Sequence, residues 1–404
     1  MVRAAAAAGR TVKAVGSGHS FPDIACTTGV QVRPSRYGRV LGYDEGSATV
    51  TVQAGITITE LSRRLARRGL ALENVGDIGY QTIAGAISTG THGTGLRFGG
   101  LATQVTGLEL VTGDGTVVAC SSGENPEILA AARVGLGALG LISTVTLRCG
   151  PAFGLRAVEE PLRLNHVLDR LDELVEANDH FEFFWVPHTD WCLTKCNNRS
   201  AGHSGPAVRL RERGRRALME NVAFGAACRL GRRWPELTPR VAPLVASGQR
   251  REYVDRSDRV FSSPRWVHFA EMEYSIPRSA ASSVIGQVRR LIDEWGLRVS
   301  FPVEVRFARG DDIALSPAYG EDRCFVAVHM YRGVAYEQYF RGVEAIMDAV
   351  GGRPHWGKLH SQTAATLAPR YPEWERFRAL RRRLDPGGRF ANAYLDRVLG
   401  PPGS

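Results

Sequence analysis

Two glycine-rich stretches near the start of the chain, each carrying a histidine, point most directly to chemistry. The first is Val15-Gly16-Ser17-Gly18-His19-Ser20-Phe21, which follows a strand-like run at 11–15. Its two glycines let the backbone turn sharply and lie close to a bound group, and a phosphate can sit against the N–H groups of such a turn. Taken alone, the same pattern is also typical of an ordinary surface loop.

The second stretch, residues 82–95, interleaves four glycines and a histidine with hydroxyl-bearing and small apolar residues. Small side chains permit close backbone approach, and hydroxyl groups supply hydrogen bonds. Two such loops in the first third of the chain favour a phosphate-bearing cofactor over chance turns. No GxGxxG pattern follows a first strand, which disfavours a dinucleotide site of the Rossmann kind.

Three later stretches carry side chains that could act on a substrate. Alternation along a strand places Glu304 and Arg306 on one face, where they form either an ion pair or part of a cleft. His329 ends an apolar strand, a setting in which a lone histidine is more often a satisfied core residue. Lys358 ends His355-Trp356-Gly357-Lys358 and, by itself, is typical of a surface lysine after a turn.

Stretch 15–21, the loop 88–93 and the late stretch 355–358 together resemble the motifs of vanillyl-alcohol-oxidase-type flavoproteins. Within that group the chain is similar to the aldonolactone oxidoreductases, which are the L-gulono-, L-galactono- and D-arabinono-1,4-lactone oxidases and dehydrogenases, and to their alditol oxidase relatives. The match runs from about residue 11 to the end, in the family's order. The resemblance implies FAD as the cofactor and hydride transfer from a substrate alcohol carbon to flavin N5.

The resemblance also implies which residues hold the cofactor. His19 occupies the position of the histidine that is bonded covalently to the 8α-methyl carbon of the flavin, and His92 is expected to pack behind the loop rather than to react. Ile142 is expected on the adenine or ribitol side of FAD. The other residues expected to bind FAD are Gly16, Ser17, Gly18, Ser20, Ser88, Thr89, Gly90, Thr91 and Gly93.

By the same resemblance, four residues are catalytic. Glu304 accepts a hydrogen bond from a substrate hydroxyl, Arg306 holds the reacting oxygen, and His329 helps the hydroxyl proton to leave. Lys358 is expected near the flavin N1–C2=O edge, where a fixed cation stabilises negative charge and lowers the pKa of the alcohol. No metal site is expected.

The expected substrate is an aldono-1,4-lactone like L-gulono-1,4-lactone, with O₂ or another electron acceptor, because stretches 271–274 and 355–358 resemble the lactone branch. An alditol oxidase acting on a polyol, or a tailoring oxidase of a sugar-containing natural product, is the alternative. A binding protein for flavin or nucleic acid without catalysis is a further hypothesis, suggested by the net charge of +10.

Composition sets limits on these interpretations. The 404 residues are 44% hydrophobic and 23% charged, enough for two domains with cores of their own. The positive charge lies largely in arginine-rich helical runs without interleaved aromatic residues, so no nucleic-acid partner is expected. Seven cysteines without CxxC spacing predict free thiols and a cytoplasmic location. No apolar run reaches about 18 residues, so no membrane span is expected.

The elements that must position these residues mix short strands and helices without a strict βαβ repeat, which predicts an α+β fold. We expect an FAD-binding domain of the vanillyl-alcohol-oxidase (PCMH) type at 1–150, whose first strand is trimmed or absent. We expect a substrate domain at 151–375, with an antiparallel sheet covered by helices, and a segment at 376–404 that returns to the FAD domain. Residues 200–216 are predicted to be an exposed loop.

The expected helices and strands can be placed along the chain. The helices are expected at 3–9, 60–68 (capped by Thr59), 124–133, 166–177, 281–295 and 374–383. The strands are expected at 11–15, 48–54, 108–112, 116–119, 141–147, 181–187, 267–274, 302–307 and 324–331.

Overall fold

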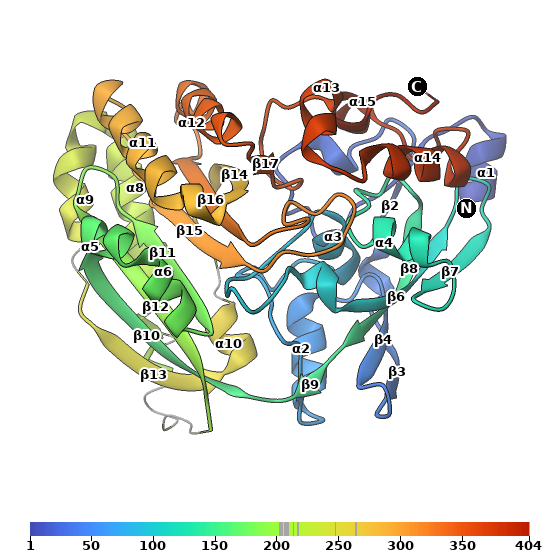
Figure 1. The fold of residues 1–404 in the computed structure, drawn as a ribbon, viewed down its shortest axis with the longest axis horizontal. Coiled ribbons are helices and arrows are strands. Elements are labelled where there is room, and N and C mark those ends of the chain that lie inside the picture. The colour runs from blue at the N-terminus through green and yellow to red at the C-terminus, as the bar shows by residue number, and fades with distance from the viewer. Residues whose placement is uncertain are drawn as a thin grey trace.

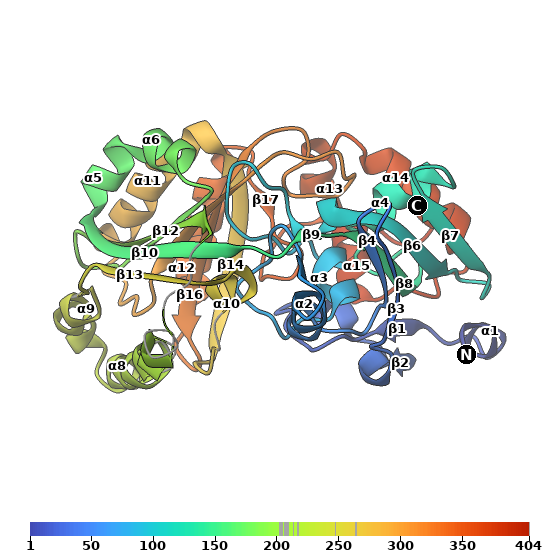
Figure 2. The ribbon, with the colours of Figure 1, turned by 90° about the horizontal axis from the view of Figure 1, so that it is seen from below.

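The structure is a computed structural model that describes residues 1–201, 205, 210–212, 214–215, 218–246, 248–262 and 265–403. It has two halves that lie side by side, each built on its own sheet (Figures 1 and 2). Mixed helices and antiparallel sheets confirm the predicted α+β class. Most of the predicted loop at 200–216 lies outside the described residues.

The N-terminal half contains a five-stranded sheet in the order β3-β4-β8-β6-β7, with antiparallel neighbours throughout. A parallel pair, β1 and β2, leads into the first glycine-rich stretch. The strands are β1 (Val12–Ala14), β2 (Val30–Val32), β3 (Val40–Asp44), β4 (Thr49–Gln53), β5 (Leu70–Ala71), β6 (Val105–Val111), β7 (Val117–Ser121) and β8 (Leu141–Arg148). The helices are α1 (Val2–Ala7), α2 (Ile58–Ala66), α3 (Ile83–Ser88) and α4 (Pro126–Ala132).

Most predicted elements of this half are confirmed within a few residues, and the 108–119 hairpin forms as β6 and β7. The predicted cap of the second helix is wrong. Thr57, not Thr59, is the N-cap of α2, and its hydroxyl accepts a hydrogen bond from the N–H of Glu60 at 3.2 Å. The Thr57-x-x-Glu60 spacing therefore starts the helix earlier than predicted.

The other half contains an eight-stranded antiparallel sheet in the order β13-β10-β12-β11-β15-β16-β14-β17. Strand β9 (Gly150–Pro151) pairs with β5 where the chain crosses between the halves. The eight strands are β10 (Gly154–Arg163), β11 (His180–Trp185), β12 (Trp191–Ser200), β13 (Arg251–Arg256), β14 (Phe269–Pro277), β15 (Val303–Ala308), β16 (Arg323–Tyr331) and β17 (Arg353–Pro354). The helices of this half are α5 (Leu164–Asp169), α6 (Leu171–Ala177), α8 (Phe224–Arg233), α9 (Thr238–Ala246), α10 (Ser257–Phe261), α11 (Ala281–Glu294) and α12 (Glu337–Ala349).

One face of this sheet is apolar and packs against α5, α6, α11 and α12. Val303, Val305 and Phe307 of β15 are fully buried there, as are residues of α11 such as Val284 and Val288. The helix predicted at 166–177 is wrong as one element, because α5 and α6 are separated at Arg170. The helix predicted at 281–295 is confirmed as α11. The opposite face of the sheet carries the charged side chains described below.

The C-terminal segment comprises α13 (Ala364–Leu367), α14 (Trp374–Leu384) and α15 (Ala393–Leu399), which confirms the predicted helix at 374–383. These helices share the core of the N-terminal half (Figure 1). Asn392 caps α15, and its amide donates to the carbonyls of Asp23, Ile24 and Cys26 at 2.9–3.1 Å. The end of the chain is thereby tied to the segment that follows the first glycine-rich stretch.

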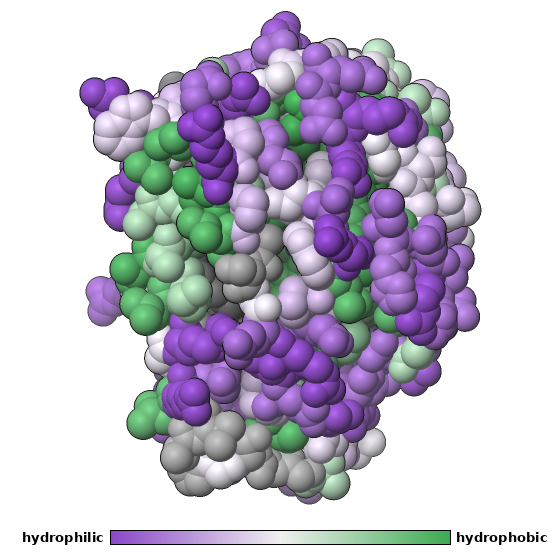
Figure 3. All heavy atoms as spheres, turned by 90° about the vertical axis from the view of Figure 1, so that its left-hand side faces the viewer, coloured by the Kyte–Doolittle hydropathy of each residue, from purple (hydrophilic) through white to green (hydrophobic). Residues whose placement is uncertain are grey.

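The outer face of the half with the eight-stranded sheet is mostly hydrophilic, with apolar residues gathered toward one edge (Figure 3). Within the described parts of the chain, no helix combines the length and apolar character needed to cross a bilayer.

Candidate active site

The first glycine-rich stretch leaves β1 and passes against the start of α3. Gly16 lies so close to α3 that a Cβ atom there would collide with the Oγ1 of Thr82. Gly18 has φ of +73°, a conformation that favours glycine. The hydroxyl of Ser17 donates to the carbonyl of Tyr80 at 2.5 Å. Residues 16–20 are all exposed, so their free backbone and side-chain groups can meet a ligand.

The second glycine-rich stretch is packed in the interior. Gly90 has φ of +76°, and a Cβ at Gly93 would lie 2.5 Å from the Oδ1 of Asn74. The hydroxyl of Thr89 donates to the carbonyl of Gly85 at 3.1 Å. Ser88 is half-buried, and Thr89, Gly90, Thr91 and Gly93 are buried. Apart from Ile142, which lies on β8, the predicted cofactor residues therefore fall into an exposed loop and a tightly packed one, and the two stretches meet where Gly16 touches Thr82.

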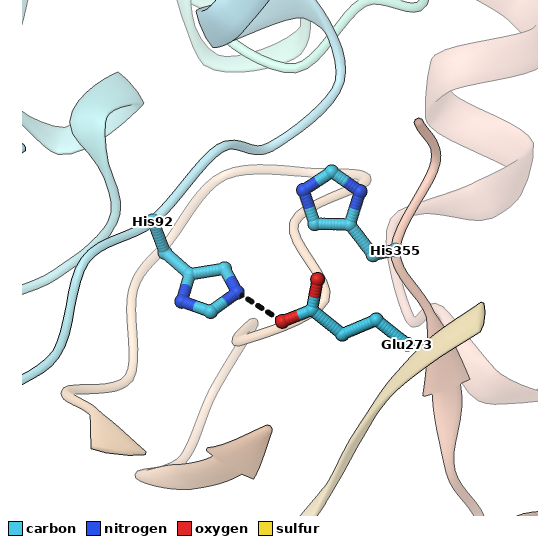
Figure 4. A group of neighbouring side chains, drawn as sticks. All are labelled: His92, Glu273 and His355. Atoms are coloured by element: carbon cyan, nitrogen blue, oxygen red, sulfur yellow. Dashed lines mark hydrogen bonds and ion pairs between the residues drawn. The ribbon is translucent and has the colours of Figure 1, made fainter. Parts of the chain in front are cut away.

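His92 connects this packed loop to the eight-stranded sheet. Its Nδ1 lies 2.8 Å from the carbonyl of Gly93, and its Nε2 lies 2.8 Å from a carboxylate oxygen of Glu273 on β14 (Figure 4). The ring stacks on Phe325 with centroids 3.7 Å apart. Both ring nitrogens of His92 thus face oxygen atoms, one in its own loop and one on β14. These contacts agree with the expected packing role of His92.

Strand β14 presents a second buried carboxylate, Glu271, on the same face as Glu273. The ammonium of Lys358 contacts Glu271 directly and lies 4.0 Å from a carboxylate oxygen of Glu273. Burial alone would raise the pKa of Glu271, but Lys358 and His329 lower it to about 2. Burial also opposes the charge of Lys358, yet Glu271 and Glu273 raise its pKa above the usual value. The ion pair therefore stays charged at neutral pH.

The stretch 355–358 is fixed along β14 by backbone hydrogen bonds. His355 donates its N–H to the carbonyl of Glu273 at 2.9 Å, and Leu359 donates to the carbonyl of Glu271 at 3.0 Å. The indole of Trp356 is fully buried and donates to the carbonyl of Leu315 at 2.7 Å. Burial lowers the pKa of His355 to about 4, so its ring is neutral. His355 and Trp356 thus support Lys358 by packing.

The same stretch brings Lys358 to the first glycine-rich loop. Phe21 donates its N–H to the carbonyl of Gly357 at 2.9 Å, and the Lys358 ammonium lies 5.3 Å from the centre of the Phe21 ring. Burial and the nearby charge of Lys358 both lower the pKa of His19. The side chain of Lys358 is only 20% exposed. The predicted cofactor loop and the predicted cation are therefore neighbours, although Phe21 and Lys358 are 337 positions apart in the chain.

His329 and the pair Glu304–Arg306 lie on the same face of the sheet. His329 on β16 pairs across the strands with Glu271 on β14, and its Nε2 lies 3.3 Å from that carboxylate. Its Nδ1 lies 3.2 Å from the carbonyl of Pro302. Arg306 contacts Glu304 on its own strand. The structure thus brings the four predicted catalytic residues to one charged surface.

A row of charges continues from this surface across β11 and β12. Glu182 accepts from the Nε of Arg306 at 2.9 Å, and the ammonium of Lys195 lies 3.8 Å from the other oxygen of Glu182. Burial opposes the charge of Arg306, but Glu304, Glu182 and Asp77 raise its pKa. Burial raises the pKa of Glu304, although the neighbouring Arg306 acts in the opposite direction.

Comparison with known proteins agrees with this arrangement. Residues 145–398 match the family described as D-arabinono-1,4-lactone oxidase, and residues 1–121 match a family described as FAD binding domain. The chain belongs to the D-arabinono-1,4-lactone oxidase family. This confirms the resemblance expected from the three motifs and the expected class of enzyme, an FAD-dependent oxidoreductase.

Individual relatives cover nearly the whole chain. An L-gulono-1,4-lactone dehydrogenase of Mycobacterium tuberculosis is 47% identical over 402 residues, which are 99% of this chain and 93% of the relative. An L-gulonolactone oxidase of Bos taurus is 36% identical, over 96% of this chain and 90% of the relative. Among solved structures, a solvent-stable cholesterol oxidase has a TM-score of 0.80 at 17% identity, covering 98% of this chain and 91% of that chain, which shows the shared fold.

Loop 16–20 and the neighbouring Lys358 are suited to binding FAD. Gly16 and Gly18 have the close approach and the positive φ of a loop shaped around a ligand, and the loop is exposed over residues 16–20. A buried cation, Lys358, stands next to it, as an electron-rich ring edge requires. Ile142 lies on β8 opposite Leu110 and packs on the N-terminal core, and its expected cofactor contact stays a prediction.

The sequence did not predict the charged residues that contact the predicted site residues in this lactone oxidase family member. Glu271 and Glu273 share the i, i+2 spacing of Glu304 and Arg306, a signal that would have marked them as a second charged strand face. Glu182 and Lys195 gave no such signal, because their strands pair only in the folded sheet. Two groups also bring possible metal-ligand atoms within 4.8 Å of one another. One is His92, Glu273 and His355 (Figure 4), and the other is Glu271, Glu304 and His329.

Proposed function

We propose that the protein oxidises an alcohol group of a sugar-derived aldono-1,4-lactone, represented by L-gulono-1,4-lactone, with FAD as the cofactor. The observation that carries the proposal is the position of Lys358. It lies beside the exposed loop 16–20 and on the same charged surface as Glu304 and Arg306. The names of the relatives, lactone dehydrogenases and lactone oxidases, support the substrate class.

Bound FAD supplies the acceptor for the hydride that leaves the substrate carbon. The loop residues 16–20, with the packed residues 88–91 and 93 behind them and Ile142 farther along, are proposed to hold it. We also propose a covalent bond from His19 to the flavin 8α-methyl carbon. The lowered pKa of His19 supports this proposal, because a neutral imidazole nitrogen is the form that can bond to carbon.

The chain's own residues are proposed to bind and polarise the substrate hydroxyl. Arg306 and Lys358 are fixed cations that lower the pKa of a hydroxyl between them and stabilise its oxygen as the proton leaves. Glu304, which contacts Arg306 on the same strand, is proposed to accept the hydrogen bond of a substrate hydroxyl. His329, whose ring nitrogens lie near the carbonyl of Pro302 and the carboxylate of Glu271, is proposed to help the hydroxyl proton to leave.

Three further features belong to the same proposal. The chain is proposed to divide into an FAD-binding domain (1–150), a substrate domain (151–375) and a returning segment (376–404). The separate sheets support the first boundary, and α14 and α15 pack in the N-terminal core together with Trp356 and Leu367 from the end of the substrate domain. The protein is cytoplasmic, since all seven cysteines lie within the described residues as free thiols. O₂ or another acceptor takes the electrons from the reduced enzyme.

Anaerobic reduction of the purified yellow protein tests the function. We expect L-gulono-1,4-lactone to bleach the flavin absorbance at a lower concentration than xylitol does, and Lys358→Met to slow bleaching at saturating lactone by about 100-fold or more. Faster bleaching by xylitol would favour the alditol oxidase alternative. A protein that neither lactone nor polyol can bleach would refute both.

The covalent bond is tested separately from activity. After acid precipitation and denaturing electrophoresis, we expect flavin fluorescence on the band of the wild-type protein and none on that of His19→Ala. His92→Ala is the matched control, because His92 is a buried histidine on the other glycine-rich loop. Fluorescence that is absent from the wild-type band would refute the bond while leaving the proposed oxidation intact.

A further inference from the structure

Lysine is rare in this chain, and each lysine is largely buried. Of 51 Lys and Arg side chains, only Lys13, Lys195 and Lys358 are lysines. Lys13 is 3% exposed, Lys195 is 9% exposed, and the side chain of Lys358 is 20% exposed. Arginine provides every other cationic side chain. An ammonium is compact and has three donors that rotate, whereas a guanidinium is large and planar. Lysine thus occurs here where a compact amine with rotatable donors lies in a largely buried position.

Two of the three lysines have contacts that account for them. Lys13 donates to the carbonyl oxygens of Phe390 at 3.1 Å and Gly137 at 3.4 Å. Lys358 contacts Glu271 at the predicted catalytic surface. Lys195 has no comparable partner.

The Lys195 ammonium lies 3.8 Å from a carboxylate oxygen of Glu182 and 4.8 Å from the centre of the Phe184 ring. Among the residues that the structure describes, none makes a hydrogen bond with it. The Lys195 side chain is still 11% exposed, and its ammonium has three donors that an oxygen atom reaching this face of the sheet can accept from. The side chain therefore has free capacity to bind an oxygen.

Lys195 faces the proposed substrate site rather than the helical side of the sheet. It pairs across β11 and β12 with Glu182, and Glu182 pairs with Arg306 on β15. Neighbouring strands are about 4.8 Å apart, so Lys195 lies about 10 Å across the sheet from Arg306. Asp77, from the N-terminal half, faces the same end of the row. Burial would raise the pKa of Asp77, but Arg265, Arg306 and Lys195 hold it well below its usual range.

We propose that Lys195 binds a hydroxyl oxygen of the exocyclic chain of the substrate and thereby favours lactones with a longer chain. The proposal rests on the proposed function. When the reacting oxygen of a six-carbon lactone contacts Arg306, its two-carbon chain can extend along the row toward Lys195. That chain carries two hydroxyl groups, each able to accept from an ammonium.

Two lactones that differ only in this chain test the proposal. D-lyxono-1,4-lactone has the ring configuration of L-gulono-1,4-lactone and lacks one exocyclic CHOH group. In the holoenzyme, we expect Lys195→Met to lower kcat/KM for L-gulono-1,4-lactone by about 10-fold or more, mainly through KM, since a lost hydrogen bond to a charged donor has that effect. The change for D-lyxono-1,4-lactone should be about threefold or less. Equal losses for both lactones would overturn the proposal.

A double variant distinguishes two roles of Lys195, binding a substrate hydroxyl and neutralising the charge of Glu182. If Lys195 served only to neutralise Glu182, the double variant Lys195→Met/Glu182→Gln would recover the wild-type ratio of the two kcat/KM values, and this would overturn the proposal. We expect the ratio to stay at the value of Lys195→Met, with Glu182→Gln alone as the reference. If neither lactone reduces the wild-type flavin, the proposed function itself fails, an outcome that is distinct from both results.

Discussion

The two glutamates of β14 contact different basic side chains. Glu271 contacts Lys358 and His329, whereas Glu273 is held by His92 at 2.8 Å. Burial by itself would raise the pKa of each carboxyl, and these basic neighbours lower it instead. Both carboxylates therefore stay ionised at neutral pH, and each fixes a group that comes from another part of the chain.

The charge of Lys358 depends on Glu271, and this can be measured. Burial opposes that charge and would lower the pKa of Lys358. The carboxylates of Glu271, Glu273 and Glu304 outweigh burial and raise this pKa. Lys358 is cationic below its pKa, so an activity that needs the cation falls as the pH rises through it. In Glu271→Gln we expect this alkaline fall to move to lower pH by about one unit or more, measured as the rate of anaerobic flavin reduction.

Glu273→Gln is the matched control for this prediction. It lies on the same strand face and is equally buried, but its carboxylate is 4.0 Å from the Lys358 ammonium and is paired with His92. We expect a smaller displacement of the alkaline fall than in Glu271→Gln. His355 and His19 also lie near Lys358, and the pKa of each is lowered, so neither titrates in the alkaline range. An unchanged profile in Glu271→Gln would contradict the role assigned to Glu271.

At the scale of elements, local patterns were predictable and pairings between distant elements were not. Alternation along one strand sufficed to place Glu304 and Arg306 together, because side chains of a strand alternate whatever its neighbours are. The contact of Glu271 with Lys358 depends on how stretch 355–359 lies along β14, and no local rule states that register. The resemblance to known flavoproteins placed Lys358 near the cofactor loop, and residue chemistry alone left it a surface lysine.

The same limit applies to the glycine-rich loops. The pattern predicted that both approach a ligand, but only the structure separates the exposed loop 16–20 from the packed loop 88–93. The helix at 166–177 failed as a single element because apolar periodicity continues across Arg170, while the backbone there leaves the helical conformation at ψ of 20°. Periodicity records which side is buried, and it does not record where hydrogen bonding is interrupted.

The packing of the first loop against α3 makes a prediction about Gly16. A Cβ atom there would collide with the Oγ1 of Thr82, the N-cap residue of α3. In Gly16→Ala we expect the loop to shift, with a loss of about 1–3 kcal/mol in the free energy of unfolding and a lower ratio of bound flavin to protein. Urea unfolding and the absorbance ratio of flavin to protein measure the two effects.

Gly42→Ala is the control for Gly16→Ala. Gly42 lies on β3, and a Cβ there meets nothing within 4 Å. The change should alter the free energy of unfolding by no more than about 0.5 kcal/mol and leave the flavin content unchanged. If Gly16→Ala behaved like this control, the close approach of the loop to α3 would not contribute to the free energy of unfolding.

At the scale of the whole molecule, the two ends of the chain are joined beneath the cofactor loop. Lys13 on β1 reaches the carbonyl of Phe390 in the returning segment at 3.1 Å, and Val12 donates its N–H to the carbonyl of Arg389 at 2.6 Å. Phe390 is fully buried against Val12 and the residues of α1. The strand that carries the first glycine-rich stretch is thus held in place by the last part of the chain.

This junction makes the stability of the molecule depend on pH. Burial, together with repulsion from Arg381, lowers the pKa of Lys13 from 10.5 to about 7. Between those two values the unfolded chain binds a proton that the folded protein lacks, so the stability of the folded state rises with pH across that window, by up to about 1.4 kcal/mol per unit. Lys13→Met lacks this pH-dependent contribution to the free energy of unfolding. We expect urea unfolding at pH 7 and pH 9 to show the wild type gaining about 2 kcal/mol relative to Lys13→Met. If the free energy of unfolding depended on pH in the same way in both proteins, Lys13 would remain charged in the folded state. Its hydrogen bonds to the carbonyls of Phe390 and Gly137 would then compensate for its burial.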